Sequence, residues 1–124
     1  MKILGIGNAI VDVICKVEDD FLINNGLTKS TMKLIFDESE FKKLLSNLKI
    51  EKTVSGGSVA NSIVGLAQLE NKVGFIGKVC DDDLGIKYEE GLKKESVEYF
   101  YSKKKEVLPT GTCLILITPD SERT

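Results

Sequence analysis

The feature that most constrains the fold is a pair of adjacent glycines, Gly56 and Gly57, between a strand-like segment (residues 52–54) and an apolar helical segment. Because glycine has no Cβ, the pair lets a ligand approach the backbone closely. The amides that open the following helix have no intrahelical acceptors and can donate to that ligand. We expect Asn61, on the first turns of the helix, to face the same ligand. The alternative is a tight turn followed by a surface asparagine.

A second polar cluster follows the first predicted strand. Residues 2–7 form a short apolar run bounded by glycine, which is typical of a buried strand in a parallel sheet. Asn8 and Asp12 come directly after it, and ligands of open α/β sheets bind at the carboxyl ends of the strands. Gly5 and Gly7 could begin a nicotinamide-binding GxGxxG motif. However, Ile10 occupies its third glycine position and residues 11–17 read as a strand rather than a helix, so this motif is rejected.

Composition excludes several classes of function. The chain has 124 residues, which suits one small domain, and it has no histidine, so Ser-His-Asp catalysis and most catalytic zinc sites are excluded. Three cysteines without CxxC spacing argue against a disulfide framework and favour a reducing cytoplasm. A net charge of -2 predicts no nucleic-acid or membrane partner, and polar residues interrupt the apolar amino terminus too early for a signal peptide or membrane span. Partners are expected to be small molecules or protein.

Periodicity predicts the remaining elements. Apolar spacing predicts helices over residues 41–48, 59–69 and 84–92, and an irregular or short helical connection over 21–29. Apolar runs predict strands over residues 31–36, 73–79, 97–101 and 110–118. Asp37 and Glu40 fit a capping box, and Asn71 fits a left-handed helix terminus.

Three further segments are charged or turn-forming. Residues 81–83 are three aspartates that could bind a metal, but capping of the next helix is favoured. Residues 103–105 are three lysines that we interpret as a solvated loop. Residues 119–122 predict a turn, after which we expect no returning strand.

Five segments together carry a resemblance to a known family. They are residues 7–12, 55–62, 75–82, 109–113 and 118–124. In this order they resemble the ribokinase-like (PfkB) carbohydrate kinase family, with adenosine kinases and adenosine-kinase-like sugar kinases as the closest likeness. The resemblance spans the chain but matches only the amino-terminal part of a family member.

The resemblance implies a three-layer α/β/α domain with a small β-lid, here truncated, so that residues 1–124 form the amino-terminal part of one kinase domain. Lid strands are expected at approximately residues 11–36 and 107–124. Family members bind substrate hydroxyls with an aspartate after the first strand and with a Gly-Gly…Asn stretch. The positions that match are Asp12, Gly56, Gly57 and Asn61.

Two further residues are implied to line the substrate pocket. Asn8 matches an asparagine of the nucleoside pocket in adenosine-kinase-like members, and Cys113 would approach the same pocket from a lid strand. The implied function is that of the substrate-binding part of an ATP-dependent kinase acting on a nucleoside or sugar hydroxyl. Adenosine is favoured, and ribose, fructose or a related sugar is the alternative.

The family's nucleotide and Mg²⁺ sites, its aspartate base and its anion hole are expected in a carboxyl-terminal part that this sequence does not contain. ATP and Mg²⁺ are therefore cofactors of the complete enzyme, and we expect neither to bind this chain tightly. No catalytic or metal-binding residue is assigned, and the chain alone is predicted to be inactive. The sequence also departs from the family at Val59, Glu70, Cys80 and Ser96, which stand where glycine, or at Val59 glycine or alanine, is common.

Two other interpretations stay open. The chain could be a non-catalytic nucleoside- or sugar-binding or interaction module, or a truncated relic that no longer folds stably. An open strand edge allows a dimer through the lid strands or pairing with a complementary carboxyl-terminal segment.

Overall fold

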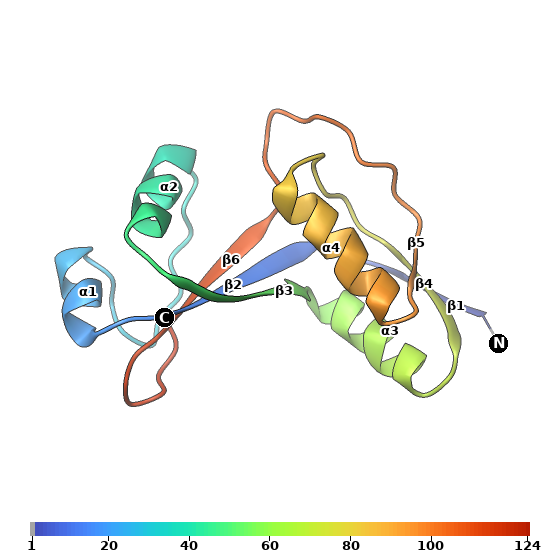
Figure 1. Ribbon diagram of the computed structural model, residues 1–124, viewed down its shortest axis with the longest axis horizontal. Coiled ribbons are helices and arrows are strands. Elements are labelled where there is room, and N and C mark those ends of the chain that lie inside the picture. The colour runs from blue at the N-terminus through green and yellow to red at the C-terminus, as the bar shows by residue number, and fades with distance from the viewer. Residues whose placement is uncertain (1) are drawn as a thin grey trace. The chain divides into compact units, whose positions relative to one another are not determined.

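The computed structural model describes residues 2–124, which form both strands and helices (Figure 1). The elements follow one another as β1 (Lys2–Ile6), β2 (Ile10–Lys16), α1 (Asp19–Asn24), α2 (Glu38–Ser46), β3 (Ile50–Gly56), α3 (Ser58–Gln68), β4 (Lys72–Ile76), α4 (Asp83–Lys94), β5 (Glu98–Tyr99) and β6 (Thr112–Ile117).

The chain divides into two compact units. Unit 1 comprises residues 1–12 and 54–113, and unit 2 comprises residues 13–53 and 114–124. The boundaries fall inside strands β2 and β3 and near the start of β6.

Unit 1 is built on a parallel sheet with the strand order β1-β4-β5. Gly5 of β1 pairs with Phe75 of β4, and β5 pairs with the other side of β4. Helix α3 packs on the face of the sheet that carries Gly5, where a Cβ would lie only 2.5 Å from the side chain of Ile63. The glycine therefore lets the helix approach the sheet closely.

The core of unit 1 lies between this sheet and its helices. Phe75 of β4 and Tyr88 of α4 are fully buried, with ring centroids 6.3 Å apart. Tyr99 of β5 joins them at 6.1 Å from Tyr88, and its hydroxyl donates to the carbonyl of Gly77. The three rings anchor α4 on the same face that α3 covers.

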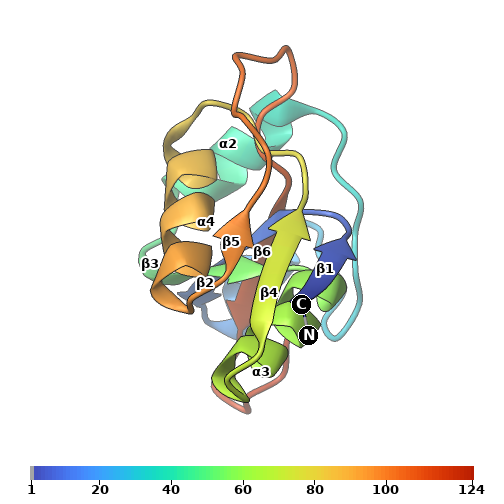
Figure 2. The same ribbon diagram turned by 90° about the vertical axis from the view of Figure 1, so that its right-hand side faces the viewer.

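On the other face of this sheet, three apolar side chains are exposed. Leu4 and Ile6 alternate with Gly5 along β1 and are 53% and 70% exposed, and Phe100 after β5 is 50% exposed. A Cβ on Gly74 would meet Phe100 and Leu4, which places these side chains on one face. Figure 2 shows the three strands turned toward the viewer, with α3 behind them. Parallel sheets are normally covered on both faces.

Unit 2 is centred on the sheet with the strand order β3-β2-β6. Alternate residues of β2, Val13 and Cys15, are buried in it. Lys29 donates to Asp19 at the start of α1 and to Asp120 in the turn after β6, at 2.7 and 2.5 Å. These contacts link the loop after α1 to the start of α1 and to the turn after β6. Burial of Cys15 raises the pKa of its thiol.

Most of the predicted elements are confirmed, with shifted ends. The predicted strands at residues 2–7, 11–17, 73–79, 97–101 and 110–118 correspond to β1, β2, β4, β5 and β6, and the four predicted helices correspond to α1, α2, α3 and α4. The lead-in at residues 52–54 lies within β3. Because β2 follows β1 without an intervening helix, rejection of the nicotinamide-binding motif is also supported.

One predicted strand is wrong. Residues 31–36 have no regular secondary structure, and Met32 and Phe36 are 86% and 93% exposed. The alternation of apolar residues there satisfies the strand pattern, but a strand also needs a partner to accept its backbone hydrogen bonds.

Two details of the predicted helix ends are also wrong. Asp37 caps α2 by accepting from the backbone N–H of Ser39, but Glu40 pairs with Lys33 at 2.6 Å instead of completing a capping box. The left-handed residue after α3 is Glu70, with φ 61°, and Asn71 instead donates its side-chain amide to the carbonyl of Leu66.

The last two corrections concern loops. A short returning segment does follow the turn after β6, because Leu116 and Thr124 exchange both backbone hydrogen bonds at 2.9 and 3.0 Å. Lys103 is not a solvated residue: it is half-buried and forms an ion pair with Glu89 of α4.

Candidate functional site

The centre of the candidate site is the contact between Asp12 and Gly56. Asp12 lies on β2, and Gly56 is the last residue of the neighbouring strand β3. A Cβ on Gly56 would lie 2.6 Å from Oδ2 of Asp12, so no other residue type fits here without moving the carboxylate. The structure therefore brings together two residues that are 44 positions apart in the sequence and that were both predicted as site residues.

The carboxyl group of Asp12 is half-buried and has an unusual pKa. Desolvation by burial raises this pKa above its ordinary value, and no cation or hydrogen-bond donor within residues 2–124 opposes that effect. A carboxylate without a protein partner can accept hydrogen bonds from a ligand. This is the chemistry that a hydroxyl-binding role requires.

Gly57 and Asn8 meet at the backbone. Gly57 caps α3 with φ 102° and ψ 131°, a conformation that side chains rarely adopt. A Cβ there would also clash with the backbone carbonyl of Asn8. The Asn8 side chain belongs to an exposed residue in the connection between β1 and β2. The two glycines thus hold the start of α3 close to residues 8–12.

Asn61 is on the first turn of α3, as predicted, but it is exposed. Its backbone N–H donates to the carbonyl of Gly57 at 2.9 Å. Its assignment as a ligand-binding side chain remains a prediction.

Cys113 lies on β6, the strand on the other side of β2 from β3. Although the residue is exposed, the pKa of its thiol is raised, first by desolvation and then by the negative charge of Asp12. Asp12 is therefore flanked by Gly56 on one side and has Cys113 within electrostatic range on the other.

Tyr88 is a site-supporting residue that the sequence pattern did not reveal. Tyr88 is a buried residue of α4, and its hydroxyl donates to the carbonyl of Gly56 at 3.2 Å, while the hydroxyl of Ser55 donates to the backbone carbonyl of Tyr88 at 3.1 Å. Desolvation raises the pKa of Tyr88, which keeps the hydroxyl protonated as a donor. In the sequence, Tyr88 is one of three apolar residues at helical spacing and cannot be told from a core residue.

The three aspartates at residues 81–83 form a helix start. Asp82 caps α4 and accepts from the N–H of Gly85 at 2.7 Å, which confirms the capping interpretation. Within residues 2–124, no group of three histidine, cysteine, aspartate or glutamate side chains is arranged to hold a metal ion.

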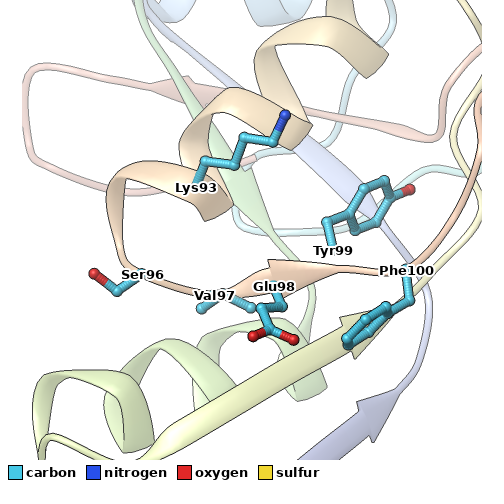
Figure 3. Close-up of a pocket in the computed structure, with 6 residues that line it drawn as sticks. All are labelled: Lys93, Ser96, Val97, Glu98, Tyr99 and Phe100. Atoms are coloured by element: carbon cyan, nitrogen blue, oxygen red, sulfur yellow. The ribbon is translucent and has the colours of Figure 1, made fainter.

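A shallow hollow lies beside β5, apart from the residues predicted to bind substrate (Figure 3). Tyr99 and Phe100 leave the chain on opposite sides, and the hydroxyl of Tyr99 is already bonded to Gly77. Glu98 pairs with Lys2 at 3.4 Å. Because the polar groups of Lys93, Glu98 and Tyr99 already have partners in the protein, this hollow is a weaker candidate than the site at Asp12. The residues that line it are Lys93, Ser96, Val97, Glu98, Tyr99 and Phe100.

None of the helices in residues 2–124 combines the length and the apolar character that crossing a membrane requires.

Comparison with known proteins gives a consistent set of relatives. The profile of pfkB family carbohydrate kinases matches residues 24–124. A 5-dehydro-2-deoxygluconokinase of Mesomycoplasma hyopneumoniae is 35% identical over 89 residues, which is 72% of this chain and 25% of the relative.

Two solved structures resemble nearly the whole chain. A probable sugar kinase of Rhizobium etli has a TM-score of 0.83 at 37% identity, and an adenosine kinase of Sinorhizobium meliloti has a TM-score of 0.82 at 35% identity. Each likeness covers 98% of this chain and 37% of the other. The predicted ribokinase-like α/β fold, truncated relative to its neighbours, is confirmed. The chain spans about a quarter of the curated relative's length and just over a third of each solved chain.

Proposed function

Because this chain belongs to the pfkB family of carbohydrate kinases, we propose that it is the substrate-binding part of an ATP-dependent kinase that phosphorylates a nucleoside or sugar hydroxyl. The observation that carries the proposal is the half-buried carboxylate of Asp12, held against Gly56 with no cation or donor of the described residues beside it.

The chemistry of the acceptor fits these groups. Neighbouring hydroxyls of a ribose or hexose can each donate a hydrogen bond, and the carboxylate of Asp12 can accept from two of them. The backbone amides at Gly56 and Gly57 and the carboxamide of Asn61 are the complementary groups in this proposal. A ligand lacking one hydroxyl would leave a buried polar group unpaired, so such a site discriminates strongly against it.

We favour adenosine as the acceptor. Support comes from the likeness to an adenosine kinase structure. The family resemblance adds that Asn8 matches an asparagine of the nucleoside pocket and that Cys113 would approach the same pocket from a lid strand. Ribose, fructose or a related sugar is the alternative. The 5-dehydro-2-deoxygluconokinase and the probable sugar kinase that the chain resembles favour this alternative.

In the whole protein, we propose that unit 2 is the small β-lid and that ATP is the phosphoryl donor. Phosphoryl transfer depends on positioning the nucleotide and on stabilising the charge of the transition state. The resemblance implies that the groups for this lie in a carboxyl-terminal part. We therefore expect residues 1–124 alone to show no kinase activity above background, and ATP-dependent phosphorylation of adenosine or ribose by the pure chain would overturn this expectation.

Isothermal titration with adenosine, ribose and fructose tests the acceptor site. We expect binding of one of these ligands, and we expect Asp12→Asn to weaken it about tenfold or more, because a hydrogen bond to a charged group contributes roughly 1.5–3 kcal/mol. Asp20→Asn, on an exposed residue of α1, is the matched control and should bind as the unchanged chain does. Equal affinity of the Asp12→Asn and Asp20→Asn variants would contradict the proposal.

A second candidate function is a non-catalytic binding or interaction module. The exposed apolar face formed by Leu4, Ile6 and Phe100 favours it, because such a face suits contact with another polypeptide. Ligand binding by a chain that stays inactive when supplied with the remaining part of a related kinase would favour the module, and restored turnover would favour the kinase. A chain without a cooperative unfolding transition would instead be a relic.

A further inference from the structure

The carboxylate of Asp82 accepts more hydrogen bonds than helix capping requires. Besides accepting from the N–H of Gly85, Oδ1 accepts from the hydroxyl of Thr110 at 2.7 Å, and Oδ2 accepts from the N–H of Thr110 at 2.9 Å. A cap needs only the bond to the first turn of the helix. The two bonds to Thr110 join α4 to a segment 28 residues farther along the chain.

Thr110 completes a closed network. Its hydroxyl donates to Asp82 and accepts from the backbone N–H of Cys80 at 3.0 Å, and the residue is only 3% exposed. Burial acts to raise the pKa of Asp82, but the hydrogen bonds from Thr110, Gly85 and Cys80 outweigh it and hold that pKa below its ordinary value. At neutral pH the carboxylate is therefore ionised and its bonds to Thr110 are charge-assisted.

Gly85 makes this close approach feasible. A Cβ there would clash with the backbone carbonyl of Cys80 and would lie 3.0 Å from the hydroxyl of Thr110. The first turn of α4 can therefore approach both Cys80 and Thr110 only because residue 85 is glycine.

The segment that Thr110 anchors leads directly to the candidate site. The carbonyl of Gly111 accepts from the N–H of Val11 at 2.8 Å, and the hydroxyl of Thr112 donates back to the carbonyl of Thr110 at 2.9 Å. The next residue, Cys113, lies within electrostatic range of Asp12. The network thus ends three residues before the side chain that flanks the proposed acceptor-binding carboxylate.

We propose that Asp82 and Thr110 are positioning residues that hold residues 111–113 beside Asp12, so that α4 fixes one wall of the acceptor site. That residues 111–113 contribute to ligand binding rests on the proposed function, whereas their position beside Asp12 does not. The competing explanation is that the network only stabilises the fold.

The thiol of Cys113 reports on this position. Cys113 is exposed, whereas Cys15 and Cys80 are buried, so a thiol reagent added to the folded chain reacts selectively with Cys113. Asp12 is the charged group that raises the pKa of this thiol, alongside desolvation. Relative to the unchanged chain, Asp12→Asn should therefore move the midpoint of the pH–reactivity profile of Cys113 to lower pH. An unchanged midpoint would overturn the placement of Cys113 beside Asp12.

The decisive variant is Thr110→Val, which keeps the shape of the side chain but removes the hydroxyl. We expect the midpoint of the Cys113 pH–reactivity profile to fall toward the ordinary pKa of a thiol. We also expect the affinity for whichever of adenosine, ribose and fructose binds most tightly to fall about tenfold, which corresponds roughly to the loss of one charge-assisted hydrogen bond. Thr110→Ser keeps the hydroxyl and should restore both readouts. An unchanged midpoint in folded Thr110→Val would overturn the proposal.

A second variant covers the case in which Thr110→Val does not fold. Asp82→Ser keeps a helix-capping oxygen for Gly85 but is too short to keep both bonds to Thr110. It should shift the Cys113 midpoint as Thr110→Val does, while Asp81→Ser, at the exposed neighbouring residue, should not. Equal midpoints in the two serine variants would overturn the proposal. If no ligand binds the unchanged chain, the proposed function fails, but the thiol profile still tests the positioning.

Discussion

At the scale of single residues, the contact between Gly56 and Asp12 makes a strong prediction. Gly56→Ala places a Cβ 2.6 Å from the carboxylate, so Asp12 must move and ligand binding should fall about tenfold or more. Gly65→Ala is the matched control: a Cβ there meets nothing within 4 Å, and alanine should stabilise α3 by about 1 kcal/mol. Titration calorimetry and urea denaturation measure the two effects. Undiminished binding by Gly56→Ala would contradict the assignment of Asp12.

The raised pKa of Asp12 gives a second residue-scale prediction. An acid whose pKa is raised in the folded state favours its protonated form, so affinity for a hydroxyl-bearing ligand should fall as the pH falls through this raised pKa. By linkage, ionised Asp12 costs folding stability above that pKa, and Asp12→Asn should raise the free energy of unfolding of the ligand-free chain at neutral pH. Calorimetry over a pH series, with Asp12→Asn as the pH-independent control, measures this. Affinity independent of pH would show that Asp12 does not bind the ligand.

The sequence allows the central residues of the site to be predicted but not their supports. Asp12 and the two glycines are recognisable because a polar residue after a buried strand and a Gly-Gly pair each have a physical reason to be there. Tyr88 and Thr110 have no such signature, since each acts through a hydroxyl whose partner lies about 30 residues away. Long-range partners of this kind depend on the fold, which local patterns do not contain.

At the scale of elements, α3 and α4 end in the same hydrogen-bond pattern, and at both ends the left-handed residue is not glycine. After α3, the N–H groups of Glu70 and Asn71 donate to Ala67 and Leu66, and Ser96 and Val97 end α4 in the same way. This is the Schellman arrangement, whose left-handed residue is usually glycine. Here that residue is Glu70, with φ 61°, or Ser96, with φ 60°.

Substitution by glycine should therefore stabilise both helix ends. A side chain in the left-handed region costs roughly 1–2 kcal/mol, part of which is offset by the greater entropy that glycine loses on folding. Glu70→Gly and Ser96→Gly should each raise the free energy of unfolding by about 0.5–1 kcal/mol, measured by urea denaturation. Glu70→Ala keeps the strain and should give no such gain. A loss of stability in both glycine variants would rule out this account of the helix ends.

Element boundaries show where pattern reasoning stops. Helices α2, α3 and α4 are predictable because an apolar stripe, joined in α2 and α4 by a capping aspartate, acts within one segment. Residues 31–36 satisfy a strand pattern yet form none, and the residues after the turn at 119–122 form a pairing that no apolar pattern announces. Strand formation depends on a partner elsewhere in the chain, so period-two alternation alone is a weaker signal than helical periodicity.

At the scale of the whole molecule, the main feature is the uncovered face of the β1-β4-β5 sheet. The chain corresponds to 37% of the solved sugar kinase chain that it resembles, and α3 and α4 cover only one face of a sheet type that is normally buried on both. We expect further polypeptide to cover Leu4, Ile6 and Phe100 in a complete protein. Alone, the 124-residue chain should associate with itself through these side chains.

Ile6→Lys tests this expectation. Ile6 is 70% exposed on the uncovered face, so lysine there buries no charge in the isolated chain and should change the free energy of unfolding by no more than about 0.5 kcal/mol. It should nevertheless reduce self-association, measured by light scattering after size-exclusion chromatography over a range of concentrations, because it places a hydrated charge in the apolar contact. Ile86→Lys, on α4 with 41% exposure, is the control for the added charge and should leave association unchanged. A monomeric unchanged chain at every concentration, or equal association of the two lysine variants, would show that this face is not the contact surface.

The same Ile6→Lys variant should also weaken complementation by the remaining part of a related kinase, because an interface that buries the lysine must desolvate its charge.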